Sequence, residues 1–267
     1  MSAIDVMFQQ LRADGRKAFM PFITAGDPDL AFSQEILQTL SEAGCDMCEL
    51  GIPYSDPIAD GPVVQASFTR ALQHGVKLAQ VFEGLAPTLA EIRMPVVTMV
   101  SYAIIYRHGL QQFVQHAAAA GFAGAIVPDL PVEEAESLAD ICRSADFSLI
   151  QLVTPTTPRD RALRIAASST GFLYYVSVTG ITGERKDLPP ELVDDVAQLR
   201  ESTELPICIG FGISRPEHVR MLSPVADGLI VGSAIVRRFA ELPQRGRAVV
   251  REDVRDYVRE LIDALRS

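Results

Sequence analysis

The chain has 267 residues, 48% of them hydrophobic and 22% charged, which is the composition of a globular protein rather than a disordered one. Its formal net charge of −10 disfavours a nucleic-acid partner, because no local basic stripe offsets the repulsion. No segment approaches the roughly 20 apolar residues of a membrane span, and the N-terminus lacks a secretory pattern, so we expect one cytoplasmic domain, residues 1–267, that contacts no membrane.

Predicted strands and predicted helices alternate along the chain. Residues 1–12 have the apolar spacing of a short amphipathic helix. Short apolar runs predict eight strands, at residues 18–24, 46–50, 95–100, 124–127, 148–153, 172–177, 206–209 and 228–231. Helical spacing between them predicts helices that include residues 31–43, 110–120, 132–145, 158–167 and 192–201. Eight βα units predict the α/β class and a single (β/α)8 TIM barrel with an extra N-terminal helix.

The second candidate fold is an open doubly wound sheet. Such a sheet usually carries a G-x-G-x-x-G fingerprint directly after its first strand. Here the first strand leads into residues 24–28, which read as a turn. The barrel is therefore preferred.

The four cysteines are too few and too scattered for a disulfide framework. Cys45 and Cys48 have C-x-x-C spacing, but the segment runs into a strand instead of opening a helix as in a thioredoxin-like site. We expect buried, reduced thiols that behave as small apolar residues.

Catalytic groups of a barrel come from the C-terminal ends of its strands. None of the lysines lies at such an end, which disfavours an imine mechanism, and all histidines fall on helices or their flanks, which disfavours a metal site. These residues are Lys17, Lys77 and Lys186, and His74, His108, His116 and His218. Carboxylates and a tyrosine remain, with general acid and base chemistry.

Glu49 ends an otherwise apolar strand, and Asp60 lies in the long connection that follows it. If Glu49 points inward, desolvation raises its pKa toward neutrality and suits it to proton transfer. The alternatives are a glutamate that faces solvent or pairs with an arginine, and an Asp60 that belongs to an ordinary turn.

Glycine-rich loops follow the sixth, seventh and eighth predicted strands. They are residues 180–183, 210–212 and 232–233. Barrel phosphate sites are frequently built from such loops, because glycine lets backbone N–H groups approach phosphate oxygens. Each of these glycine-containing loops, taken alone, is also explained by ordinary loop geometry. Phe22, Val100, Phe211 and Ile230 either line an apolar pocket beside these loops or are plain core.

Four segments together resemble the tryptophan synthase α subunit family. They are residues 21–28, 49–62, 128–134 and 210–213, and the resemblance spans nearly the whole chain. The second segment, with Glu49 eleven residues before Asp60, is the most specific. The resemblance implies retro-aldol cleavage of indole-3-glycerol phosphate to indole and glyceraldehyde 3-phosphate, with no metal or cofactor in this chain.

The resemblance also implies roles for individual residues. Glu49 would carry the acid and base steps, Asp60 would accept the indole N–H, and Tyr174 would position the reacting groups. The phosphate would bind at Gly183, Gly212, Gly232 and Ser233. The indole pocket would be Phe22, Val100, Tyr102 and Phe211. Thr182 would belong to a loop that closes over the ligand.

The family usually works as an αββα complex, whose β subunit carries pyridoxal phosphate and would face Pro53 to Asp60. This chain has Ile104 where an asparagine is common, in the region that communicates with the partner. Three alternatives stay open. They are a free-standing lyase that releases indole, a non-catalytic barrel that binds a phosphorylated metabolite, and an isomerase of the same barrel class, although the isomerase does not account for residues 53–62.

Overall fold

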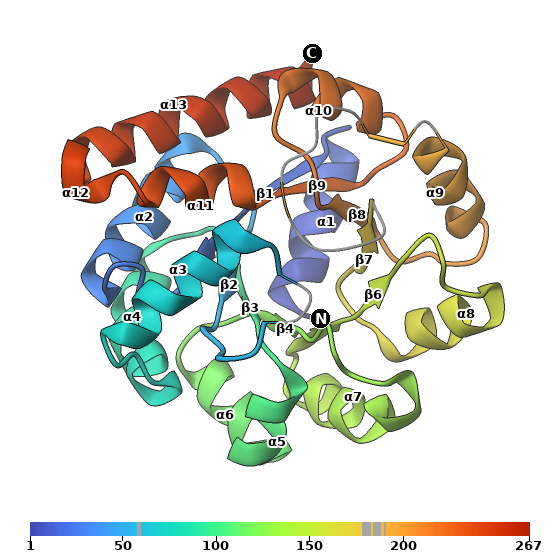
Figure 1. Ribbon diagram of the computed structural model, residues 1–267. Helices are drawn as coiled ribbons and strands as arrows, with labels where there is room; N and C mark the ends of the chain where they lie inside the picture. Colours follow the sequence, from blue (N-terminus) through green and yellow to red (C-terminus); the bar gives the residue numbers. More distant parts are fainter. Residues whose placement is uncertain (58–59, 178–182, 184–187, 190) are drawn as a thin grey trace.

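The computed structural model describes residues 1–57, 60–177, 183, 188–189 and 191–267. Its strands form one parallel sheet inside a ring of helices (Figure 1). The strands are β1 (Ala18–Thr24), β2 (Cys48–Gly51), β3 (Val96–Met99), β4 (Gly124–Ile126), β5 (Ser148–Ile150), β6 (Leu152–Val153), β7 (Leu173–Val176), β8 (Ile207–Gly210) and β9 (Gly228–Val231).

Helices follow the strands in the order expected of βα units. In the described part of the chain they are α1 (Ala3–Ala13), α2 (Leu30–Ala43), α3 (Pro62–Gln73), α4 (Leu78–Glu91), α5 (Tyr102–His108), α6 (Leu110–Ala119), the 3-10 helix η1 (Val132–Glu134), α7 (Ala135–Ser144), α8 (Arg159–Ser168), α9 (Leu192–Arg200), α10 (Pro216–Leu222), α11 (Ser233–Phe239), α12 (Leu242–Arg245) and α13 (Arg247–Arg266). Among these, none is long and apolar enough to cross a membrane. The α/β class and the barrel are confirmed.

Closure of the barrel depends on one divided strand. The sheet order runs β5-β4-β3-β2-β1-β9-β8-β7-β6, so its two ends are β5 and β6. These are consecutive segments separated only by Gln151, and they correspond to the single strand predicted at residues 148–153. The first segment pairs with β4 and the second with β7. The chain therefore passes from one edge of the sheet to the other. With β5 and β6 counted as one strand, the sheet is a closed barrel of eight strands.

Gln151 has its own contacts at this corner. Its backbone carbonyl accepts a hydrogen bond from the Tyr174 N–H at 3.1 Å, and its side-chain Nε2 donates to Ser168 Oγ at 2.8 Å. A buried polar residue must satisfy its hydrogen bonds locally. The first bond ties the corner to β7, the strand that carries Tyr174, and the second ties it to the end of α8.

The predicted N-terminal helix is α1, and in Figure 1 it lies behind the strands. Ser2 and Asp5 form a capping box, with the Asp5 N–H donating to Ser2 Oγ at 3.2 Å and the Ser2 N–H donating to Asp5 Oδ2 at 2.9 Å. Its buried Phe8 packs 6.0 Å from the ring of Phe172, in the cluster that fills the barrel interior. One end of the barrel is thus plugged by apolar side chains, which leaves the other end for a site.

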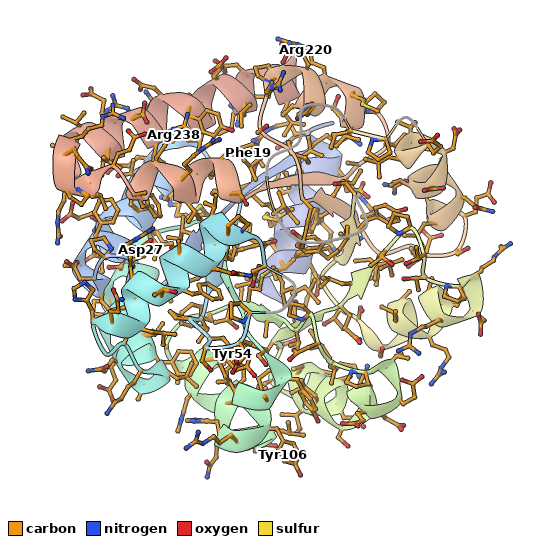
Figure 2. The ribbon with its side chains drawn as sticks, in the orientation of Figure 1. Phe19, Asp27, Tyr54, Tyr106, Arg220 and Arg238 are labelled. Carbon is orange, nitrogen blue, oxygen red and sulfur yellow. The ribbon has the colours of Figure 1, made fainter. Side chains whose placement is uncertain are left out.

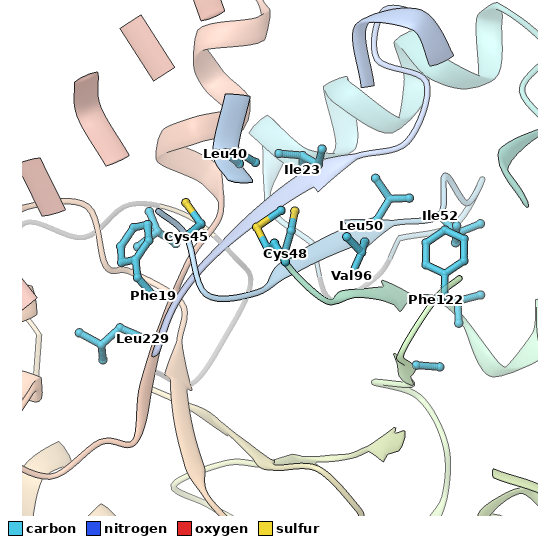
Figure 3. Packing of buried hydrophobic residues seen from close by; sticks show 14 of the residues in the cluster. Phe19, Ile23, Leu40, Cys45, Cys48, Leu50, Ile52, Val96, Phe122 and Leu229 are labelled. Carbon is cyan, nitrogen blue, oxygen red and sulfur yellow. The ribbon is translucent and has the colours of Figure 1, made fainter. Parts of the chain in front are cut away.

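The larger part of the core lies between the strands and the helices. Figure 3 shows Cys45 and Cys48 in this layer, among side chains such as Ile23 and Leu40. All four cysteines are free and buried, as expected. Burial raises the pKa of Cys142 to about 12, so that this thiol stays protonated and unreactive at neutral pH.

Candidate active site

A cavity that is partly open to solvent lies where the strands end. It is lined by Phe22, Glu49, Asp60, Val64, Met99, Tyr174, Gly183, Phe211, Gly212, Ile213, Ile230, Gly232 and Ser233. These residues come from the ends of β1, β2, β3, β7, β8 and β9 and from the segments that follow them. Residues far apart in the sequence meet here because all parallel strands end at the same side of a barrel.

Glu49 enters the cavity because of the alternation of side chains along β2. Its neighbours Cys48 and Leu50 belong to the core under the helices, so Glu49 points the other way, into the barrel. The side chain is 0% exposed, and among the described residues neither of its carboxyl oxygens has a hydrogen-bond partner. Burial raises the pKa of Glu49 well above its ordinary value. Burial therefore favours the neutral carboxylic acid, the form that can donate a proton.

Asp60 reaches the same cavity from the segment before α3. Its backbone N–H donates to the Pro57 carbonyl at 3.1 Å, and its own carbonyl accepts from Gln65 Nε2 at 2.6 Å. Partial burial raises the pKa of Asp60 to about 6. Asp60 is therefore mostly ionised at pH 7, whereas burial favours the protonated form of Glu49 more strongly. Two carboxyl groups held in different protonation states can serve as an acid and as an anionic acceptor.

Helix α3, which Asp60 precedes, is anchored by a buried carboxylate. Asp27 is 1% exposed and follows β1. It accepts hydrogen bonds from Arg70 Nε at 2.8 Å and Nη2 at 2.5 Å, and from the hydroxyl of Ser67. Both partners lie on α3. A buried charge that is paired and hydrogen-bonded in this way holds its partners in one geometry, so the start of α3 is positioned against the end of β1.

Tyr174 faces the cavity from β7, and its neighbour Tyr175 faces outward into the helix layer. Burial raises the pKa of Tyr174 well above its ordinary value, and the neighbouring Glu49 and Asp60 raise it further when they are ionised. The hydroxyl therefore remains a hydrogen-bond donor. Gly210 at the end of β8 makes room for it, because a Cβ built there would overlap Tyr174 Oη and lie 2.6 Å from its Cζ.

This close approach leads to a prediction for Gly210→Ala. We expect the added methyl group to displace the Tyr174 ring and to reduce turnover about 100-fold, the size of loss that a misplacement of about 1 Å can cause. Overpacking should also lower the free energy of unfolding by about 1–3 kcal/mol. Steady-state kinetics and urea unfolding measure the two effects. Gly84→Ala in α4, where the nearest atom is a flexible Leu30 methyl at 3.3 Å, is the matched control. Normal turnover in Gly210→Ala would contradict the proposed role of Tyr174.

The segment after β8 has an unusual backbone. Phe211 and Gly212 both have positive φ angles, of 73° and 78°. A bulky residue in this region is strained, and such strain is concentrated at functional sites. The Ser177 hydroxyl donates to the Phe211 carbonyl, and the Phe211 ring lies edge-on to Tyr174 at 6.0 Å. These contacts hold the turn against β7 and direct Gly212 into the cavity.

The remaining polar lining consists of Gly183, Gly212, Gly232 and Ser233. None of the described residues that line the cavity is lysine, arginine or histidine. Gly232 and Ser233 begin α11, where the first N–H groups of a helix have no carbonyl partner within that helix. Backbone N–H groups and one hydroxyl can hold a phosphate without a cationic side chain.

The apolar wall differs in part from the residues named in the sequence analysis. Phe22, Phe211 and Ile230 line the cavity, whereas Val100 and Tyr102 are not among the lining residues. Val100 is buried in the core under the helices. Tyr102 begins α5, and its N–H donates to Asp129 Oδ1 at 2.7 Å.

Three of the lining residues were not predicted from the sequence. Met99 lines the cavity from β3, and Val64 and Ile213 line it from the segments after β2 and β8. Alternation from Val97, which faces the barrel interior, is the signal that could have identified Met99 and excluded Val100. Thr182, the residue named for loop closure, lies outside the described residues.

The sequence model of a family described as "Tryptophan synthase alpha chain" matches residues 8–266. A tryptophan synthase alpha chain from Rhodopirellula baltica is 56% identical, covering 100% of this chain and 97% of the relative. One from Prochlorococcus marinus is 48% identical, with coverage of 90% and 87%.

Solved structures agree with these relatives. The tryptophan synthase subunit alpha from Legionella pneumophila superimposes with a TM-score of 0.91 at 32% identity, covering 100% of this chain and 99% of the other. A tryptophan synthase structure from Mycobacterium tuberculosis has a TM-score of 0.88 at 31% identity, with the same coverage. The sequence over residues 8–266 and the whole barrel thus match the same family.

Proposed function

Because this chain belongs to the tryptophan synthase α chain family, we propose that its cavity is the active site of a carbon-carbon lyase and that Glu49 is the group that moves the protons. The reaction is the cleavage of indole-3-glycerol phosphate to indole and glyceraldehyde 3-phosphate. The observation that carries the assignment is a fully buried carboxyl group without a partner among the described residues, placed beside Asp60 and Tyr174.

The proton movements begin from a protonated Glu49 and an ionised Asp60. Neutral Glu49 donates its proton to C3 of the indole ring, which turns the ring into an electrophilic indolenine. The ring nitrogen becomes positively charged, and the Asp60 carboxylate accepts its N–H. The Glu49 carboxylate then removes the proton of the side-chain hydroxyl. The carbon-carbon bond breaks, its electron pair returns to the ring, and a carbonyl forms. Glu49 ends as it began, protonated, which suits a catalyst with a raised pKa.

Binding is divided between two parts of the cavity. The phosphate would accept hydrogen bonds from backbone N–H groups at Gly183, Gly212 and Gly232 and from the Ser233 hydroxyl. The indole would pack against Phe22 and Phe211, and against the neighbouring apolar residues Val64, Met99 and Ile230. Thr182 would close over the bound ligand and exclude water from the indolenine.

We further propose a β-type partner subunit that carries pyridoxal phosphate and contacts residues 53–60. In this segment Ser55 and Asp56 are exposed, while Pro53 is buried. This chain itself would supply no group to that cofactor. Ile104 lies half-buried on α5, packed against the core under the helices. An apolar side chain there cannot make the amide hydrogen bonds of an asparagine.

Turnover of indole-3-glycerol phosphate by the isolated chain, measured with and without a tryptophan synthase β subunit, tests these proposals. We expect slow cleavage by the isolated chain and strong activation in the complex. Full activity alone, with no complex detected by analytical ultracentrifugation, would instead support a free-standing lyase. Binding of the phosphate ligand without any turnover in either state would support a non-catalytic barrel and would contradict the proposed function.

A further inference from the structure

A pair of histidines lies where α5 meets α6, away from the cavity. His108 is the last residue of α5, and His116 lies in the last turn of α6. The joining residue, Gly109, has a φ of 93° and ends the first helix. His108 Nε2 and His116 Nδ1 are 3.0 Å apart, and the ring centroids are 5.2 Å apart. The same helix α5 carries Tyr106, which is 72% exposed at the rim of the molecule in Figure 2.

The separation of these two nitrogens suits a shared metal ion. Imidazole nitrogens bind Zn²⁺, Cu²⁺ and Ni²⁺, and a metal–nitrogen bond is about 2.0–2.1 Å long. Two nitrogens in adjacent positions of a square or octahedral coordination sphere are therefore about 3 Å apart. The rings need only turn so that their lone pairs meet at one point beside the helices. His116 is exposed, so that an ion can reach this point from solvent.

His108 is also available in the neutral form that metal binding requires. Burial lowers the pKa of His108, and the neighbouring His116 lowers it further. At pH 7 His108 is therefore largely unprotonated, and its single ring proton can reside on the nitrogen that faces away from His116. His108 is held in place by the ring of Phe113, whose centroid lies 6.5 Å away in an edge-on arrangement.

We propose that His108 and His116 form a two-histidine site for a divalent transition-metal ion, at which Cu²⁺ binds more tightly than Ni²⁺ or Zn²⁺. The order follows from the general affinities of nitrogen ligands for these ions. No group of three or more histidine, cysteine, aspartate or glutamate side chains in the described part of the chain could hold a metal. Water would therefore complete the coordination sphere, which makes this an exchangeable surface site that joins α5 to α6.

Titration of the full-length protein with Cu²⁺ at about pH 7.5, in a buffer that does not bind copper, tests the proposal by electron paramagnetic resonance. We expect one tight site whose spectrum shows coupling to two imidazole nitrogens. Once one imidazole binds Cu²⁺, the other imidazole is present at a high effective concentration. His108→Ala and His116→Ala should therefore each weaken Cu²⁺ binding about 100-fold. The remaining signal in each variant should show a single nitrogen.

His74→Ala is the matched control, because His74 is an exposed histidine at the end of α3 with no neighbouring histidine among the described residues. Copper affinity should be unchanged in this variant. Circular dichroism and cleavage activity verify that all three variants are folded. Unchanged affinity in His116→Ala, or a wild-type spectrum with only one nitrogen, would overturn the proposal. Neither result would affect the proposed lyase, because the pair lies outside the cavity.

Discussion

Glu49→Gln is expected to lower the turnover of indole-3-glycerol phosphate by about 10³- to 10⁴-fold, the upper part of the range for loss of a general acid or base. Glutamine has nearly the same shape but can neither donate a proton to C3 nor accept one from the hydroxyl. Binding of the phosphate-bearing ligand should remain close to normal, because the proposed phosphate contacts lie on other strands. Single-turnover kinetics and calorimetric titration with a substrate analogue measure the two quantities separately.

Cys48→Ala is the matched control for this variant. It changes the adjacent residue of the same strand, but on the side that faces the helices. We expect it to retain turnover within a few fold while losing some stability. Near-normal turnover in Glu49→Gln, or an equal loss in both variants, would contradict the proposed mechanism.

The Glu49→Gln substitution should also change how the free energy of unfolding depends on pH. The folded pKa of Glu49 is raised above its ordinary value of 4.5, so the folded state binds the proton more tightly than the unfolded chain. The contribution of Glu49 to stability is therefore complete below about pH 4.5 and is lost as the pH rises toward the raised pKa. Glutamine has no such titration. Unfolding experiments should accordingly show less loss of stability at high pH in the variant than in the wild-type protein.

Asp60→Asn is expected to reduce turnover by about 10²- to 10³-fold, comparable to the loss of one group that stabilises transition-state charge. The amide oxygen can still accept a hydrogen bond from the indole N–H, but it carries no negative charge to oppose the developing positive charge. The Michaelis constant should change less than the turnover number, because the charge develops only in the transition state.

The pH profile separates this role from a merely structural one. The pKa of Asp60 is raised to about 6, so the carboxylate form is lost as the pH falls through 6. Wild-type activity should decrease about tenfold per pH unit below that value, and the Asp60→Asn variant should lack this decrease between about pH 5 and 7. A profile that keeps the same acidic limb in the variant would assign the limb to another group and would contradict the role of Asp60.

The barrel itself was predictable from local sequence, because each βα unit contains its own alternation of apolar patterns. The prediction was least accurate at residues 148–153, which the structure divides at Gln151 into β5 and β6. Nothing local marks this division. It arises because the first part of the segment pairs with β4 and the second with β7, which is a consequence of closing the barrel.

The residues that line the cavity could also be predicted only in part from local sequence. Glu49 and Asp60 could be singled out by their positions at and after a strand end, but Val100 was chosen for the pocket and Met99 was not. Whether a strand-end residue faces the barrel or the helices depends on the phase of the pleat, which a shift of one residue reverses. The contact between Gly210 and Tyr174 could not be anticipated either, since it joins two strands whose separation is set by the barrel.

By itself, the sequence determined the order of βα units, the family and the chemical types of the reacting groups, since these depend on residue identity and spacing. Only the tertiary structure decided that Glu49 is fully buried without a partner among the described residues and that Asp60 is partly buried beside the same cavity. The physical reason is desolvation. It depends on every atom that surrounds a group, and it is what separates the pKa values of the two carboxyl groups.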